Sequence, residues 1–206
     1  AYSAANPDVK ISVTGGGSGT GIAALINGEI SIATSSRAIK DTELKQARDN
    51  GMEPLEFTVA RDTLSVIVNK ENPISKLTIE QISKIYKGEI KNWKEVGGND
   101  KEITLYGRQS TSGTYIYFLE EVVKGDYAKT MRNMEGTQAI IDATKQDKSA
   151  IGYAGVGYIL DEKGMPVDGI KVIDVAKDKN SKYISPLDEY TITQYPISRP
   201  LFLYVS

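Results

Sequence analysis

The chain has 206 residues, with 25 Lys and Arg against 27 Asp and Glu and a formal net charge of −2. It contains neither Cys nor His, which excludes disulfides, zinc–thiolate sites, cysteine nucleophiles and Ser-His-Asp triads. The charge lacks the basic excess of nucleic-acid binders, and no apolar run approaches the roughly 20 residues that cross a bilayer. The composition is that of a globular chain of one or two domains, in which oxygen-ligand metals and carboxylate chemistry remain open.

Short runs rich in β-branched residues alternate along the chain with segments of helical composition or spacing. Strands are predicted at 9–13, 30–34, 55–61, 63–69, 103–107, 150–154, 171–175 and 201–205. Helices are predicted at 22–26, from 41 or 42 to the Asn-Gly at 50–51, and at 115–123 and 137–145. The segment 78–81 (TIEQ) matches a capping box that begins another helix, which ends at Lys87-Gly88. The alternation predicts the α/β class with mostly parallel sheets.

A glycine-rich loop at 14–21 (TGGGSGTG) follows the first predicted strand and precedes a helix. It lacks the Lys of a P-loop, and Thr20 and Ile22 stand where the third glycine of a dinucleotide fingerprint is required. Two interpretations remain open. The loop is either a flexible connection, or a nest of backbone N–H groups around a small oxyanion to which Ser18 adds a hydroxyl.

A second loop carries the pattern Arg108-x-x-x-Ser112-Gly113-Thr114 between a predicted strand and a predicted helix. A guanidinium at the strand end can reach over the helix N-terminus, where its planar fork matches two oxygens of a tetrahedral anion. Gly113 would let the backbone approach the anion closely. The alternative is a solvated Arg beside an ordinary helix cap. A weaker signal of the same kind is the turn of Ser35, Ser36 and Arg37.

Asp62 lies between two extended segments, where β propensity disfavours it. It either pairs with Arg61 or Arg37, or it is a single acceptor among many donors. An acceptor would have a physical purpose, because phosphate carries a proton at neutral pH and sulfate does not. A buried carboxylate would accept a hydrogen bond from phosphate and repel sulfate.

Seven segments in this order resemble the phosphate-binding proteins of ABC phosphate importers. They are TGGGSGTG, ATSSR, ARDTLSVIVN, TIEQISKIYKGEIKNW, GRQSTSGTY, AIGYAGVGY and RPLFLYV, and the resemblance extends along essentially all of residues 1–206. It implies a periplasmic-binding-protein-like fold, in which two α/β domains joined by crossover strands close on one dehydrated phosphate.

The resemblance also implies domain boundaries. The first domain would comprise residues 1–61 with 197–206, the second would comprise 63–195, and the crossovers would lie near 62 and at 196–200. Compared with the family, the chain is expected to begin near the end of the first helix, and to lack the first strand and its phosphate loop as well as the C-terminal helices.

Residue by residue, the resemblance assigns phosphate contacts to the serine of the glycine-rich loop and to the Arg-x-x-x-Ser-Gly-Thr loop. These residues are Ser18, Arg108, Ser112, Gly113 and Thr114. Ser36 stands where many members carry the accepting aspartate, so the acceptor is either Ser36 or Asp62, the latter with Arg37 as its partner.

The expected function is that of an extracytoplasmic, periplasmic or lipid-anchored solute-binding protein that delivers inorganic phosphate to an ABC permease. We expect a monomer that is not an enzyme, has no cofactor or metal, and does not bind nucleic acid. Three alternatives remain: a binder of sulfate or molybdate, a non-binding scaffold or adhesin, and a phosphomonoester hydrolase. The hydrolase would need Ser112 or Thr114 as its nucleophile.

Overall fold

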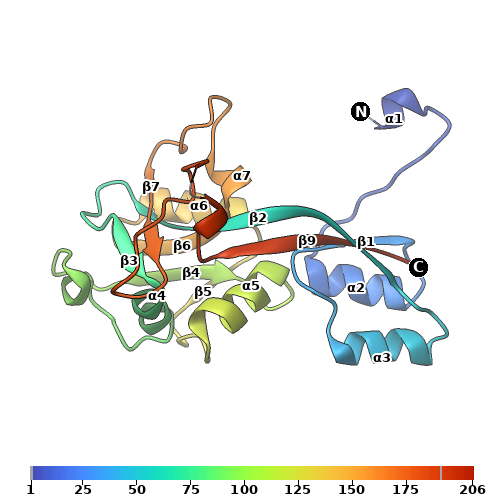
Figure 1. Cartoon of the computed structure of the whole chain (residues 1–206), viewed down its shortest axis with the longest axis horizontal. Coiled ribbons are helices and arrows are strands. Elements are labelled where there is room, and N and C mark those ends of the chain that lie inside the picture. The colour runs from blue at the N-terminus through green and yellow to red at the C-terminus, as the bar shows by residue number, and fades with distance from the viewer. Residues whose placement is uncertain (1, 191) are drawn as a thin grey trace.

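The computed structural model describes residues 2–190 and 192–206, most of which form two lobes joined by a pair of long strands (Figure 1). The smaller lobe consists of α2, β1, α3 and the parts of β2 and β9 beside them. The larger lobe consists of the elements from β3 to η3, with the remaining parts of β2 and β9. Helix α1 (Tyr2–Ala5) lies apart from both lobes at the end of an extended segment (Figure 1).

The bounds of the elements follow the chain. The smaller lobe contains α2 (Ser18–Ile26), β1 (Ile32–Ser35) and α3 (Asp41–Asp49). The two long strands are β2 (Leu55–Asn69) and β9 (Ser198–Val205). The larger lobe begins with β3 (Lys76–Thr78), α4 (Ile79–Tyr86), η1 (Trp93–Val96), β4 (Thr104–Arg108), α5 (Gly113–Phe118), the π-helix η2 (Leu119–Val123) and β5 (Arg132–Met134). It continues with α6 (Thr137–Gln146), β6 (Ala150–Gly155), α7 (Val156–Ile159), β7 (Ile170–Val172), β8 (Asp174–Ala176) and η3 (Ile192–Gln194).

One sheet runs through both lobes in the strand order β1-β9-β2-β6-β4-β5, and β7 also pairs with β2. β4 pairs in parallel with β5 and β6, and β3 pairs in parallel with β8. The ladders of the two long strands are antiparallel, because β9 returns along β2 after the chain has completed the larger lobe. The expected α/β class is confirmed, and the sheet is mixed.

Buried apolar side chains form separate cores in the two lobes. In the smaller lobe, α2 and α3 pack on one face of the sheet through Ile22, Leu25, Ala47, Phe202 and Tyr204. In the larger lobe, two clusters pack against its part of the sheet. Among the largest side chains that they bury completely are Tyr86, Phe118 and Tyr153. No described helix is long and apolar enough to cross a membrane.

Two strand predictions need correction. The segment 9–13 is irregular, and Val9, Ile11 and Val13 are exposed, because no described strand pairs with it. The segments 55–61 and 63–69 form one continuous strand, β2, so Asp62 lies within a strand and not in a connection. A register shift between Thr58 and Ala60 is the one irregularity in the pairing of β2 with β9.

Candidate functional site

The smaller lobe contributes two hydroxyls at the ends of neighbouring elements. Gly17 precedes α2 with φ +99°, a backbone conformation that favours glycine, and Ser18 is the first residue of the helix. The Ser36 amide, just after β1, donates to Ser18 Oγ at 3.0 Å, and the two Oγ atoms lie 3.3 Å apart. The turn after β1 is thereby fixed against the N-terminus of α2, where backbone N–H groups lack helical partners.

The larger lobe contributes the loop between β4 and α5. Ser112 caps α5, since its Oγ accepts a hydrogen bond from the Thr114 amide at 3.2 Å. Ser112 and Thr114 are both buried. The predicted pattern therefore forms a strand that ends at Arg108 and a capped helix that begins at Gly113.

The two loops contact each other directly. The Gly19 amide donates to the carbonyl of Thr111 at 3.1 Å, and Thr111 Oγ1 donates to the carbonyl of Gly16 at 3.3 Å. A Cβ on Gly113 would collide with the Ser18 hydroxyl and would lie 2.6 Å from Ser36 Oγ. Position 113 leaves no room for a side chain, and the structure brings together Ser18, Ser36 and Gly113, three of the residues to which the resemblance assigns phosphate contacts.

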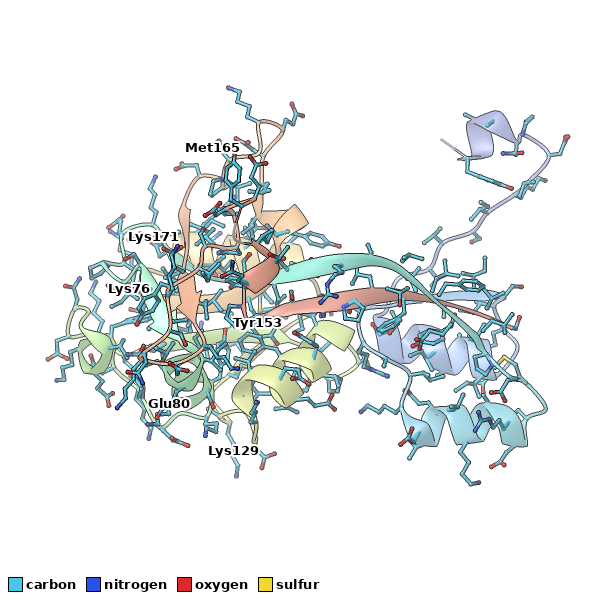
Figure 2. The ribbon with its side chains drawn as sticks, in the orientation of Figure 1. Lys76, Glu80, Lys129, Tyr153, Met165 and Lys171 are labelled. Atoms are coloured by element: carbon cyan, nitrogen blue, oxygen red, sulfur yellow. The ribbon has the colours of Figure 1, made fainter. Side chains whose placement is uncertain are left out.

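Arg108 is half-buried at the end of β4 and bonds to residues of the larger lobe. Its Nη1 donates to Thr137 Oγ1, at the start of α6, at 3.0 Å, and its amide donates to the Tyr153 hydroxyl at 3.1 Å. Burial lowers the pKa of Arg108, and the nearby positive charge of Arg199 lowers it further. Burial also raises the pKa of Tyr153 to about 12, so this hydroxyl stays protonated at neutral pH. Figure 2 shows Tyr153 in the interior of the larger lobe, with Lys129 at its periphery.

Asp62 forms an ion pair that the sequence analysis did not predict. Its Oδ2 accepts from Arg199 Nη2 at 2.9 Å and from Arg199 Nε at 3.3 Å. The same Nη2 donates to Thr114 Oγ1 at 2.9 Å. The pairing of Asp62 with Arg61 or Arg37, one of the two interpretations left open by the sequence, is therefore wrong, because Arg199 lies directly opposite Asp62 in the β2–β9 ladder.

Arg37 is engaged within the smaller lobe. Its Nη1 and Nη2 donate to the two carboxylate oxygens of Glu43 at 2.8 and 2.6 Å, and Nη1 also donates to the carbonyl of Ala38. Burial acts to raise the pKa of Glu43, but hydrogen bonds from Arg37 and from the Lys40 amide hold it below its usual value. A phosphate contact from Arg37 stays a prediction, and its bidentate pair with Glu43 supports a structural role.

Sequence reasoning missed two polar residues of this region, Thr137 and Arg199. Arg199 opens the RPLFLYV segment, but its relation to Asp62 depends on a strand register spanning 137 residues of chain. Thr137 opens α6 after Gly136, with no side-chain cap at that terminus. No local motif marks either residue.

The assembled groups consist mainly of hydrogen-bond donors with one carboxylate acceptor. Hydroxyls and amides come from the two loops, and guanidinium groups come from Arg108 and Arg199. Such a set suits a tetrahedral oxyanion that carries a proton, because one acceptor matches the single donor of the anion. Within the part of the chain that the structure describes, no group of three or more acidic side chains is arranged to hold a metal ion.

Comparisons with known proteins show which family the chain is similar to. A family profile described as a PBP superfamily domain matches residues 1–206. The phosphate-binding protein PstS of Staphylococcus aureus (strain USA300) is 37% identical over 204 residues, covering 97% of this chain and 60% of that protein. The chain therefore spans less than two thirds of the length of this relative.

Two solved structures share the fold. One is a phosphate ABC transporter substrate-binding protein of Clostridium perfringens with bound phosphate, with a TM-score of 0.84 and 30% identity, covering all of this chain and 78% of that one. The other is an ABC-type phosphate transport receptor of Vibrio cholerae, with a TM-score of 0.73 and 29% identity, covering 99% and 78% of the two chains.

Proposed function

The chain belongs to the PBP superfamily, and we propose that it captures inorganic phosphate between its two lobes for delivery to an ABC importer. The phosphate-binding relatives from Staphylococcus aureus and Clostridium perfringens support this choice of ligand. The ligand would contact residues of both lobes, namely Ser18, Ser36, Arg108, Ser112, Gly113 and Thr114, with Asp62 as the acceptor.

The convergence of Ser18 and Ser36 on Gly113 carries this proposal. These residues come from different lobes, and the contact leaves no space for a side chain at position 113. Helix α2 begins at Ser18 and α5 begins at Gly113, so the N-termini of both helices lie at this contact, and helix N-termini favour anions. Arg108 supplies the guanidinium, and burial strengthens its hydrogen bonds to an anion.

The same proposal includes the domain boundaries that the resemblance implies. One domain would comprise residues 1–61 with 197–206, the other would comprise 63–195, and the crossovers would lie near 62 and at 196–200, although α1 lies apart from both lobes. The long pairing of β2 with β9 supports this division, because both strands pass from one lobe to the other. The protein acts outside the cytoplasm as a monomer, makes and breaks no bond, and has the importer's permease as its partner.

Isothermal titration of the purified chain with phosphate, sulfate and molybdate tests the ligand. We expect phosphate to bind far more tightly than the other two anions, because only phosphate offers a proton to Asp62. Tighter binding of sulfate or molybdate would refute the proposal, and no binding of any anion would favour a scaffold. Turnover of a chromogenic phosphate ester would instead favour the hydrolase.

The substitution Asp62→Asn tests the acceptor. The amide can donate to sulfate, so the preference for phosphate over sulfate should fall by tenfold or more, on the order of the discrimination expected for one buried hydrogen bond. Asp49→Asn, at an exposed carboxylate on α3, is the matched control and should leave the preference unchanged. An unchanged preference in the Asp62 variant would transfer the acceptor role to Ser36.

A further inference from the structure

Arg199 connects three elements through one buried guanidinium. It lies on β9 opposite Asp62 of β2, and its side chain is only 4% exposed. Two of its N–H groups engage a single oxygen of Asp62, and Nη2 also donates to Thr114 at the start of α5. The guanidinium lies 5.4 Å from the ring centre of Tyr117, whose hydroxyl donates to the carbonyl of Ser198.

The contacts leave one atom of each partner unused. Asp62 Oδ1 accepts no hydrogen bond from any described residue, whereas Oδ2 accepts two. Arg199 Nη1 is buried and has no acceptor among the described residues. The pair therefore keeps one free acceptor and one free donor, on an ion pair that is bonded to Thr114 through Arg199 Nη2.

We propose that Arg199 is a positioning residue that sets the preference for phosphate over sulfate, an inference that rests on the proposed phosphate function. By engaging Oδ2, Arg199 holds the carboxylate so that Oδ1 remains the acceptor for the proton of hydrogen phosphate. By engaging Thr114 at the same time, it fixes this acceptor relative to the donors of α5. The positive charge of Arg199 also offsets the repulsion between Asp62 and an incoming anion.

A lysine cannot replace this arrangement, because the fork of N–H groups on a guanidinium can bridge Asp62 and Thr114 at once. An ammonium group is a point charge without fixed directions, and it would leave the orientation of the carboxylate undetermined. The substitution Arg199→Lys therefore separates the effect of geometry from that of charge. It keeps the positive charge but removes the contact that joins Asp62 to Thr114.

The test is isothermal titration of the full chain with phosphate and with sulfate for Arg199→Met and Arg199→Lys. We expect Arg199→Met to weaken phosphate binding about 100-fold or more and to lower the phosphate-to-sulfate ratio about tenfold or more, as for the loss of a buried charge-assisted contact. Arg199→Lys should recover part of the affinity but little of the ratio. The matched control Arg61→Met removes one exposed charge from the adjacent strand position and should leave the ratio unchanged.

A purely structural role for Arg199 would lower the thermal midpoint without changing the ratio in the folded protein. Because Arg199→Met leaves a buried carboxylate unpaired and risks unfolding, the double variant Asp62→Asn with Arg199→Met provides a second measurement. If Arg199 acts through Asp62, the double variant has the same phosphate-to-sulfate ratio as Asp62→Asn alone.

Two outcomes would overturn this inference and leave the proposed function intact. One is an unchanged ratio in folded Arg199→Met, and the other is a double variant whose ratio falls well below that of Asp62→Asn. Failure of the unmodified chain to bind phosphate would instead refute the proposed function, and the inference with it. The binding of the unmodified chain thus distinguishes the two failures.

Discussion

The two lobes differ in how their parts of the sheet are covered. The larger lobe packs two buried clusters against its strands and completely buries Phe118, Tyr86 and Tyr153. The smaller lobe covers one face with α2 and α3, while Ile32, Leu55, Phe57 and Val59 are each more than half exposed. The strands of the larger lobe are thus covered by apolar packing, whereas one face of the strands in the smaller lobe is open to solvent.

This difference matters for the candidate site. Arg108, Ser112 and Thr114 are placed by elements that pack against the larger core, whereas Ser18 and Ser36 are held by hydrogen bonds at the edge of the smaller one. Near Ser36, the chain is secured by Arg37 and Glu43. The comparison therefore predicts that substitutions in the apolar core mainly lower the stability of the larger lobe. Substitutions in the Arg37–Glu43 ion pair should mainly lower the stability of the smaller lobe.

The largest effect should come from removing an aromatic side chain from the larger core. Phe118 stacks on Tyr153 at 4.1 Å and meets Tyr86 edge-on at 5.0 Å between ring centres. Phe118→Ala should lower the free energy of unfolding by about 3–5 kcal/mol, because it leaves a cavity in a packed core. Phe57→Ala is the matched control on the open face and should cost less than about 1 kcal/mol, as measured by urea denaturation. Equal costs would contradict the comparison.

The next effect concerns the contributions of the lobes to binding. Arg108→Ala should weaken phosphate binding by about 2–4 kcal/mol, because it removes a buried charge-assisted contact. Ser18→Ala in the smaller lobe should cost about 1 kcal/mol, the typical value of a neutral hydrogen bond. Titration calorimetry checks both variants, with the exposed Arg48→Ala as control. A loss below tenfold for Arg108→Ala would count against its role.

A smaller effect should follow from breaking the ion pair of the smaller lobe. Glu43→Gln leaves Arg37 largely buried without its carboxylate, and should lower the free energy of unfolding by about 1–3 kcal/mol. Glu53→Gln breaks an exposed pair with Arg48 and should cost less than about 1 kcal/mol. Hydrogen exchange should show faster opening of α2 and α3 in the Glu43 variant, with the larger lobe unchanged. Uniform acceleration over both lobes would argue that they open together.

The smallest effect is a change in how the stability of the larger lobe depends on pH. Burial raises the pKa of Tyr153 from 10.0 to about 12. The raised pKa contributes to the free energy of unfolding. This contribution is fully present below pH 10 and is lost as the pH rises from 10 to 12. Tyr153→Phe should reduce the loss of stability over that window by on the order of 1 kcal/mol per pH unit. Denaturation curves at pH 9, 10 and 11 measure this slope, and an unchanged slope would contradict the burial argument.

Local patterns predicted much of the fold. Thr78 and Gln81 form the expected capping box, with each side chain bonded to the amide of the other residue. The two Gly/Ser/Thr loops both begin helices, and Gly113 makes the close approach that its residue type suggests. The capping box and the transitions from loop to helix depend on neighbours within a few residues, which a single sequence displays, whereas the partners of Gly113 are distant in the sequence.

Long-range partners were not predictable in the same way. The pairing of Asp62 with Arg199 follows from strand register, and the missing pairing of segment 9–13 depends on which strands lie beside it. The choice of Glu43 by Arg37 depends on α3 folding back beside the turn after β1. In each case the residue type was visible, but the partner was set by tertiary geometry.

The antiparallel ribbon of β2 and β9 has a mechanical consequence. Its ladder hydrogen bonds resist sliding of one strand past the other, whereas adjacent strands of a sheet are naturally twisted relative to one another. Relative movement of the lobes would therefore proceed as torsion about the ribbon axis. Because Asp62 and Arg199 form a rung of that ribbon, torsion would rotate this ion pair together with the ribbon, and under the proposed function the orientation of the carboxylate would then change with the angle between the lobes.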